Sequence, residues 1–419
     1  MDVFKTVHMD VDQASTDNPD EVDILVKMKE RPIWGLNFGV TNTMDGQNLE
    51  FNSSLRLRNL LGGAEVTQVD LTGTKESIAA GEISSMAISV RDIRTSFSSK
   101  FRNFFKLFKE NQDWSNVSSF RTVNTGGIVG AVTPDGRHRV EYEAAVRHME
   151  PTKQPTLPLI PVEGIPLVRT PSVSILREAS SPSYKSAVRY TYTDNQVKGN
   201  EYVPTSGYRV VQKVEAAGFG GDVSYLKSET SAQYHHPITP TLTASITSRV
   251  GWIAPWKNLF SFGGQSDPQT NLLQSSSSSS SSNVPAAVPP GKSAVPILDR
   301  FFLDQAFVRG VPPSALGGVD GKDALGSTTY ANVNAFLTKQ IPNTPLSAHV
   351  FANVGTALPG CDTPINSENI VKNSHCSVGF GAVAPLAQLG RLEVNVASRY
   401  TESGFGAAEF RFILAGTDF

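Results

Sequence analysis

The feature that most constrains this chain is a repeated alternation of apolar and polar residues along short segments. In residues 49–58 the odd positions are mostly apolar, and the even positions carry Glu50, Asn52, Arg56 and Arg58. Because a β-strand points successive side chains to opposite faces, such a segment has one apolar and one ionic side. The same alternation recurs at 139–144, 391–396 and 409–414. The chain is therefore predicted to be all-β.

Alternation by itself fits two environments. In a soluble β-protein the ionic face meets bulk water and the apolar face a shared core; in a membrane barrel the apolar face meets lipid and the ionic face lines a wet lumen. Between Ile33 and Leu414 about sixteen such segments follow one another, each about ten residues long, the length that a tilted strand needs to cross a bilayer. Their number and spacing favour a sixteen-stranded antiparallel transmembrane β-barrel over residues 32–419.

Composition narrows the class of protein further. Lys and Arg total 37 against 39 Asp and Glu, a balance that argues against a nucleic-acid partner. No segment approaches the roughly 18 consecutive apolar residues of a membrane helix. Membrane lipid is therefore expected to contact strands, which must close into a cylinder because unpaired backbone groups in hydrocarbon cost several kcal/mol.

Several segments interrupt the strand pattern. Residues 1–31 predict a short hairpin too small to be stable alone. Residues 98–111 place phenylalanines at 101, 104, 105 and 108, the spacing of an amphipathic helix with a basic edge. Residues 151–166 form a proline-rich connector. The longest loop covers 253–326 and contains a run of serines at 275–282, a low-complexity insertion.

An even number of strands places both chain ends on the same side of the membrane. The turns near 235–240, 342–345 and 387–390 are predicted on that side, and the long loops at 253–326 and 356–372 on the other.

Residues that would indicate catalysis or metal binding are sparse. His235 and His236 adjoin Pro237 in a predicted turn and lack the spacing of a metal site. The glycines at 218–221 lie between two strands rather than before a helix, which indicates a hairpin turn and not a phosphate loop. Cys361 and Cys376 are interpreted as free thiols. We therefore expect no enzyme activity, no cofactor and no metal.

One loop carries a motif found in a known family. The run from Arg300 to Gly326 contains Phe301-Phe302-Leu303 and then Val308-Arg309-Gly310. Its last ten residues repeat glycine and aspartate. It resembles the conserved loop of the outer-membrane protein insertase superfamily, whose members include bacterial BamA and the barrel of the mitochondrial sorting and assembly machinery. Residues 57–65 are similar to the end of that family's second strand, and 377–381 and 390–395 resemble its penultimate strands, in the right order. Two departures are Val311 in place of an aromatic residue and Asp304-Gln305 in place of two glycines.

The resemblance implies a location for the motif and for the N-terminal hairpin. In the family the loop folds back into the lumen, which would set Arg309 against the inner wall. An arginine there needs a carboxylate or carbonyl partner, and the candidates are Glu393, Glu409 and Asn353. Residues 1–31 would be the remnant of a polypeptide-transport-associated (POTRA) domain.

The resemblance also implies a function. The barrel would fold and insert β-barrel precursor proteins into the mitochondrial outer membrane, together with accessory subunits. Precursors would enter at a lateral seam between the first and last strands, at Leu36, Phe38, Val40, Phe410, Phe412 and Leu414. The alternatives are a passive porin-like channel, a polypeptide-secretion barrel of the same superfamily, and a soluble β-rich binding protein.

Overall fold

A computed structural model describes most of the chain. The described residues are 4–13, 22–42, 49–60, 62–74, 83–93, 101–115, 117–152, 154–155, 168–200, 203–255, 295–303, 306–312, 316–360, 363–385, 391–401 and 404–415. The serine run at 275–282, most of the proline-rich connector and Cys361 lie outside these ranges. Cys376 is a free, exposed thiol, as expected.

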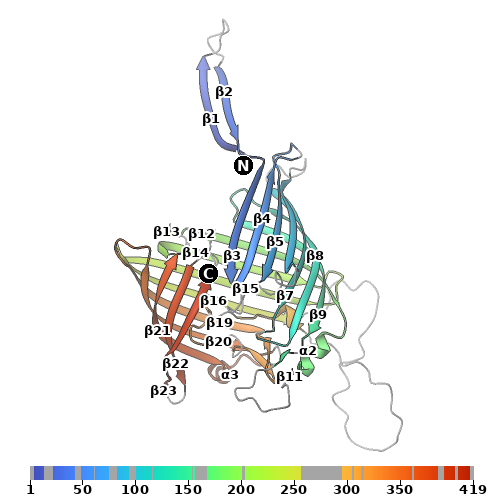
Figure 1. Ribbon diagram of the computed structural model, residues 1–419, viewed down its shortest axis with the longest axis vertical. Coiled ribbons are helices and arrows are strands. Elements are labelled where there is room, and N and C mark those ends of the chain that lie inside the picture. Colours follow the sequence, from blue (N-terminus) through green and yellow to red (C-terminus); the bar gives the residue numbers. More distant parts are fainter. Residues whose placement is uncertain are drawn as a thin grey trace, which may run out of the picture.

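Sixteen long antiparallel strands form a closed barrel (Figure 1), which confirms the predicted architecture. Two short strands, β13 (Lys198–Asn200) and β23 (Gly404–Phe405), continue β12 and β24. The long strands are β3 (Trp34–Asn42), β4 (Leu49–Arg58), β5 (Val66–Thr74), β6 (Ser85–Ile93), β7 (Arg102–Asp113), β8 (Phe120–Val132), β9 (His138–Pro151), β12 (Ser183–Asn195), β14 (Val203–Ala217), β15 (Tyr225–Thr239), β16 (Leu242–Pro255), β19 (Thr329–Gln340), β20 (Ser347–Leu358), β21 (Ser374–Pro385), β22 (Arg391–Thr401) and β24 (Glu409–Ala415).

The strand register aligns like side chains into rows around the barrel. One outward row runs from Leu36 through Leu55, Val69 and Ile88 to Leu107, all apolar. An inward row runs Glu141, Arg189, Glu215 and Lys227, with opposite charges directly across each strand pair. Such cross-strand pairs stabilise one register. A slip by one residue would bring the charges to the lipid side.

The predicted helix over 98–111 is wrong. Residues 102–113 form strand β7, which pairs with β6 and β8. Phe104 and Phe108 are buried on the inward side, whereas Phe105 and Leu107 are exposed on the outward side. The phenylalanines follow the helical period and are divided between the two faces of the strand. The strand forms nevertheless, because pairing with two neighbours satisfies the backbone along its whole length.

The histidine pair was also misplaced. His235 and His236 lie within β15, and the chain turns only at residues 240–241. His235 faces inward and contacts the hydroxyl of Ser245 on β16 at 2.8 Å. Strand β15 continues through Pro237, which pairs with Thr243 close to the end of the strand.

The two ends of the barrel differ. Both termini lie at one end, together with the β15–β16 and β19–β20 turns, and the helices α2 (Val173–Glu178) and α3 (Ser367–Lys372) lie at the other (Figure 1). None of the described helices is long and apolar enough to cross a membrane. The hairpin of β1 (Phe4–Gln13) and β2 (Val22–Glu30) projects from the end that carries the termini. Further short elements are β10 (Gln154–Pro155), β11 (Val168–Arg169), the 3-10 helix η2 (Ile297–Asp299), β17 (Gly318–Asp320) and β18 (Asp323–Gly326).

The barrel closes where its last strand, β24, lies beside its first, β3. Among the described residues, this contact is the least extensive between any two neighbouring long strands. Leu36, Phe38 and Phe410 are exposed on these strands. The side chains of Val40, Phe412 and Leu414 lie outside the described residues.

Candidate functional site: a loop docked inside the barrel

Residues 295–303 and 306–312, which lie between β16 and β19 in the chain, are in the lumen and supply much of its apolar core. Phe307, Val308 and Val311 have no exposed surface. Their cluster includes Phe301 of the same loop and Tyr330 of the wall, whose rings meet edge to face at 4.7 Å between centroids. Since these residues lie in the barrel interior, their burial holds the loop against the wall. Each buried side chain of this size contributes about 1.5–3 kcal/mol.

Arg309 forms a two-point ion pair with Glu393 on β22. Its Nε donates to Oε2 at 3.0 Å, and a terminal nitrogen donates to Oε1 at 3.1 Å. Both side chains are nearly fully buried, with 3% and 1% of their surface exposed. A parallel, bidentate pair is the geometry in which a guanidinium and a carboxylate compensate best for lost water. Of the three candidate partners, Glu393 is the one that the structure places against the guanidinium.

Aromatic rings complete the pocket around the arginine. The guanidinium carbon lies 4.6 Å from the ring centre of Phe336 on β19 and 5.8 Å from that of Phe351 on β20. Cation–π contacts of this kind strengthen when water is excluded. The Arg309 side chain is therefore held by three wall strands.

Glu393 is itself positioned by neighbouring polar groups. The amide of Asn395 donates to its Oε2 at 3.2 Å, and His349 contacts the Asn395 amide oxygen at 2.8 Å. These contacts fix the carboxylate plane, so Arg309 meets a preorganised acceptor.

Gly310 lets the loop approach the wall. Its φ of +87° is left-handed, and a Cβ there would lie 2.8 Å from the Cβ of Ala397 on β22. Any side chain at this position would push Arg309 away from Glu393.

The other two candidate partners have different contacts. Asn353 lies beside the motif: with its amide oxygen turned toward the loop, it accepts a hydrogen bond from the backbone N–H of Arg309 at 3.1 Å. Glu409 instead pairs with Arg399 at 3.3 Å, in a half-exposed position.

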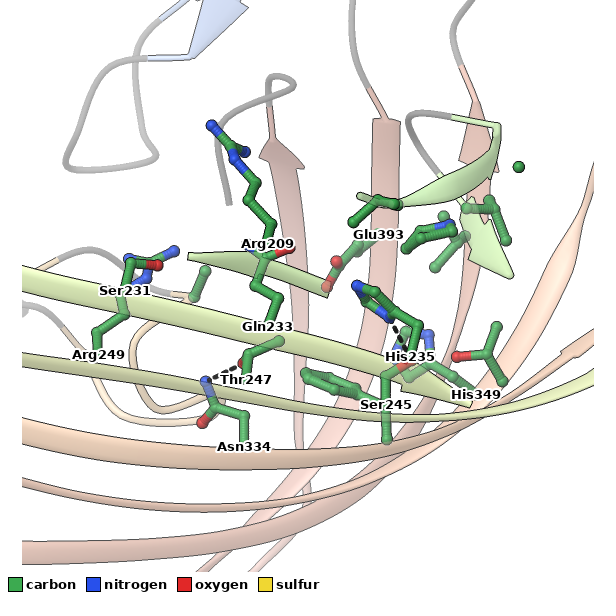
Figure 2. Close-up of a pocket in the computed structure, with 18 of the residues that line it drawn as sticks. Arg209, Ser231, Gln233, His235, Ser245, Thr247, Arg249, Asn334, His349 and Glu393 are labelled. Carbon is green, nitrogen blue, oxygen red and sulfur yellow. Dashed lines mark hydrogen bonds between the residues drawn. The ribbon is translucent and has the colours of Figure 1, made fainter. Parts of the chain in front are cut away.

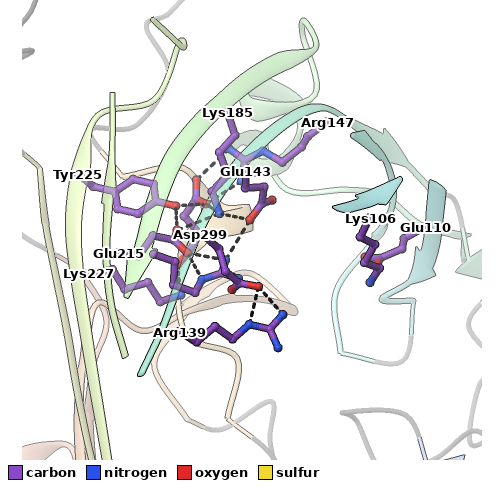
Figure 3. A network of polar contacts seen from close by, with 12 residues as sticks. Lys106, Glu110, Arg139, Glu143, Arg147, Lys185, Glu215, Tyr225, Lys227 and Asp299 are labelled. Carbon is purple, nitrogen blue, oxygen red and sulfur yellow. Dashed lines mark hydrogen bonds and ion pairs between the residues drawn. The ribbon is translucent and has the colours of Figure 1, made fainter. Parts of the chain in front are cut away.

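A second anchor, absent from the sequence-based candidates, holds the start of the loop to the opposite wall (Figure 3). Asp299, at the end of η2, accepts two hydrogen bonds from Arg147 of β9 at 2.6 and 2.9 Å. The hydroxyl of Tyr225 on β15 donates to the same carboxylate at 2.7 Å, and Lys227 donates to the backbone oxygen of Asp299 at 2.8 Å. The Asp299 and Arg147 side chains are 3% and 6% exposed.

Further ion pairs connect this anchor to the wall. Lys185 lies 2.8 Å from Glu215 and 3.9 Å from Asp299. Arg189 contacts Glu215 at 2.5 Å and Glu143 at 3.0 Å. Because each charged side chain has several partners of opposite sign, the network is rigid. Removing one of these side chains would leave buried charges without full compensation and lower the stability.

The end of the loop is pinned at the far mouth of the barrel. Asp323 on β18 accepts hydrogen bonds from the Ser119 hydroxyl and the Ser172 N–H, each at 2.7 Å. Asp320 on β17 accepts from the hydroxyl of Ser174, on α2, at 2.7 Å. Hydrogen bonds from Ser174 hold the pKa of Asp320 below its ordinary value.

Two of the cavities formed by the described residues lie in the lumen beside the loop. One, of about 360 Å³, lies next to Arg309 and Glu393 and is lined by polar side chains of β14–β16 that include Arg209, His235 and Arg249 (Figure 2). The other, of about 370 Å³, borders Asp299 and the charged wall of β9, β12 and β14. Over the described ranges, no group of three or more His, Cys, Asp or Glu side chains is arranged to hold a metal ion.

Comparison with known proteins places this architecture in a family. The family model of the Omp85 superfamily domain matches residues 59–417. The chain belongs to the Omp85 superfamily. Among curated proteins, this Omp85 chain is 25% identical over 413 residues to "Sorting and assembly machinery component 50 homolog A" of Xenopus laevis, covering 94% of this chain and 75% of that protein.

The fold of this Omp85 chain also matches a solved structure. BamA from Haemophilus ducreyi lacking POTRA domains 1–3 superposes with a TM-score of 0.64 at 14% identity, covering 98% of this chain and 75% of that one. The protein is therefore an outer-membrane β-barrel with the insertase fold.

Sequence reasoning found Arg309 and missed Asp299. The aspartate follows Leu298 directly in a loop, where an acid usually meets solvent. A signal was present, however: Arg147 has the same odd-numbered parity as the ionic positions of the segment 139–144, and a buried cation on that face requires a carboxylate partner.

Proposed function

We propose that this protein is the barrel subunit of the mitochondrial sorting and assembly machinery and inserts β-barrel precursors into the mitochondrial outer membrane. The name of its Xenopus relative, a component of a sorting and assembly machinery, supports assembly with accessory subunits. The mitochondrial membrane is inferred from the resemblance of the loop motif at 308–310 to the barrel of that machinery. The observation that carries the proposal is the limited contact between β3 and β24. The pair of strands with the least contact costs the least to separate.

An open seam would present unpaired backbone groups in the membrane. A precursor strand that pairs with β3 or β24 satisfies those groups, which is β-augmentation inside a bilayer. Satisfying backbone groups and burying the apolar face of the product in lipid provide the free energy. The mechanism requires no nucleotide, cofactor or catalytic residue.

The docked loop would hold the remaining strands in place while the seam between β3 and β24 opens. Glu393 lies on β22, the strand next to β24, so Arg309 ties the loop to the wall beside the seam. The Asp299 anchor ties the same loop to β9 and β15 across the lumen. With both anchors made, β24 can separate from β3 while β22 keeps its position.

Crosslinking tests the seam directly. A cysteine replaces Phe38, which is exposed on β3, in a chain carrying Cys361→Ser and Cys376→Ala. A β-barrel precursor arrested during import, with cysteines along its last strand, should form an adduct at position 38. Val140→Cys is the matched control, because Val140 is also exposed on an outward position, on β9 far from the seam. An insertion-competent barrel that gives no more adduct at 38 than at 140 would refute the seam mechanism.

A further inference from the structure

Helix α3 is attached to the barrel wall through β20 and β21, at the end away from the termini (Figure 1). The hydroxyl of Thr356 on β20 donates to the backbone oxygen of Ile370 at 3.2 Å. The hydroxyl of Ser374 on β21 donates to the same oxygen at 2.6 Å, and the two hydroxyl residues are direct partners in the strand pairing. The last turn of α3 is therefore held by two neighbouring strands.

The two hydroxyls lie on the outward face of these strands. Phe351 of β20 faces the lumen, because its ring lies beside the Arg309 guanidinium, and Gly379 of β21 is its direct partner. Thr356 and Ser374 are each five residues away from these inward positions, an odd number. Since β20 and β21 pair without a bulge, both hydroxyls point to the opposite face, and α3 contacts the side of the wall that meets lipid.

The attachment lies at the depth of an aromatic girdle. Val354, two residues from Thr356 on the same outward face, is exposed and begins a row that continues by direct pairing through Cys376 to Tyr400. Tyr400 is exposed, and its ring lies 5.4 Å from that of the exposed Phe405. Exposed aromatic residues near the strand ends mark the level where hydrocarbon gives way to headgroups. Helix α3 begins at this level.

Apolar side chains of α3 and its entry are exposed at the same level. Val371 has 74% of its surface exposed and Ile365 has 68%. On the helix, Ile370 and Val371 lie on one side, and the exposed Glu368 and Lys372 on the other. A helix of this kind suits a bilayer interface, with its apolar side in the upper acyl chains and its lysine directed to the phosphates.

We propose that α3 is an interfacial helix whose partner is the lipid surface of the leaflet at the end away from the termini. Continuity identifies the occupant: the exposed, lipid-facing surface of β20 and β21 passes from Val354 through Thr356 directly to Ile370 and Val371. The bilayer that surrounds the strands therefore also reaches the helix. This contact with lipid does not depend on the insertion of precursors.

Helix α2 provides a contrast within the same molecule. It also has six residues, lies at the same end of the barrel and exposes an apolar side chain, Leu176. Its buried Ile175, however, packs in a cluster with Met149, which lies on the inward face of β9, two residues from Arg147. Since α2 is attached over the lumen, Leu176 is expected to meet water rather than lipid.

Fluorescence quenching in lipid nanodiscs, where both mouths of the barrel are open to solvent, tests the proposal. The full chain carries Cys361→Ser and Cys376→Ala, and a single cysteine is labelled with bimane. Val371→Cys reports on α3, and Leu176→Cys on α2 is the matched control. Phe380→Cys, exposed on the outward face of β21, is the lipid-facing reference. Heat-modifiable migration on gels checks that each labelled barrel is folded.

Lipids with bromine near the headgroup end of the acyl chains should quench the label at 371 nearly as strongly as at 380 and several-fold more than at 176. Dissolved iodide should give the opposite order. Strong iodide quenching at 371 without an effect of brominated lipid would place α3 in water and overturn the proposal. A label at 371 that neither quencher reaches would be covered by protein, which overturns it as well.

Discussion

At the scale of single residues, the docking of the loop depends on buried charged side chains. Arg309 and Glu393 are both nearly fully buried and bonded at two points. A pair of this kind contributes modestly when intact, yet removing one partner leaves an uncompensated charge. The cost of a single substitution therefore exceeds the net contribution of the pair.

We expect Glu393→Gln to lower the free energy of unfolding by about 3–5 kcal/mol. The measurement is denaturant unfolding of the barrel in lipid, followed by tryptophan fluorescence. Replacing the half-exposed Glu409, which pairs with Arg399, should cost about 0–1 kcal/mol. Equal losses for the two variants would mean that Glu393 is not acting as a buried partner.

Asp299→Asn should detach the start of the loop. The change leaves Arg147 buried without its carboxylate, so we again expect a loss of about 3–5 kcal/mol. The readout is the rate at which trypsin cleaves at Arg300 in the folded barrel. Asp320→Asn, which removes a carboxylate from the far mouth, is the control and should leave that rate unchanged.

At the scale of elements, β17 and β18 form a hairpin held to α2 by hydrogen bonds. The pKa of Asp320 is lowered because the hydroxyl and N–H of Ser174 favour its ionised form. A lowered folded-state pKa stabilises the contact above the ordinary value of 3.8, and this stabilisation is lost as pH falls through the lower folded-state value.

Peptic digestion at graded acidic pH tests this contact. Cleavage within residues 316–326 should increase as pH falls below 3.8. In Asp320→Asn the same cleavage should already be high above that pH and change little with it, after correction for the pH dependence of pepsin on an unfolded substrate. Identical profiles for the two proteins would show that Asp320 does not hold the hairpin.

Strand β7, which the sequence pattern predicted as a helix, shows that neighbouring strands can determine the conformation of a segment. Residues 101–108 carry phenylalanines at a helical period, whereas the strand places Phe104 and Phe108 inward and Phe105 outward. Local periodicity therefore favoured the wrong structure. Pairing with β6 and β8 decided for the strand, and it involves residues that are distant along the chain.

At the scale of the whole molecule, the described part of the loop lies in the lumen and borders two cavities there. A passive channel needs a continuous water path, and the described residues 306–312, docked against the wall, fill part of the lumen. Deleting residues 300–320 should therefore raise the single-channel conductance in planar bilayers several-fold. Deleting the serine run at 275–282 is the matched control and should leave conductance unchanged. An intact chain that already conducts as well as the deletion variant would favour the porin interpretation.

The sequence by itself determined the class of fold, the number of long strands and the identity of the loop motif. Alternation at 49–58 or 391–396 is a local property, because a strand exposes opposite faces whatever lies beside it. The tertiary structure alone decided which charges meet. Asp299 reaches Arg147, 152 positions away, and Arg309 selects Glu393 over Glu409, because only closure of the barrel brings those inward faces to the loop. Which side chains meet across the lumen depends on the register and curvature of many strands together. No short stretch of sequence encodes this arrangement.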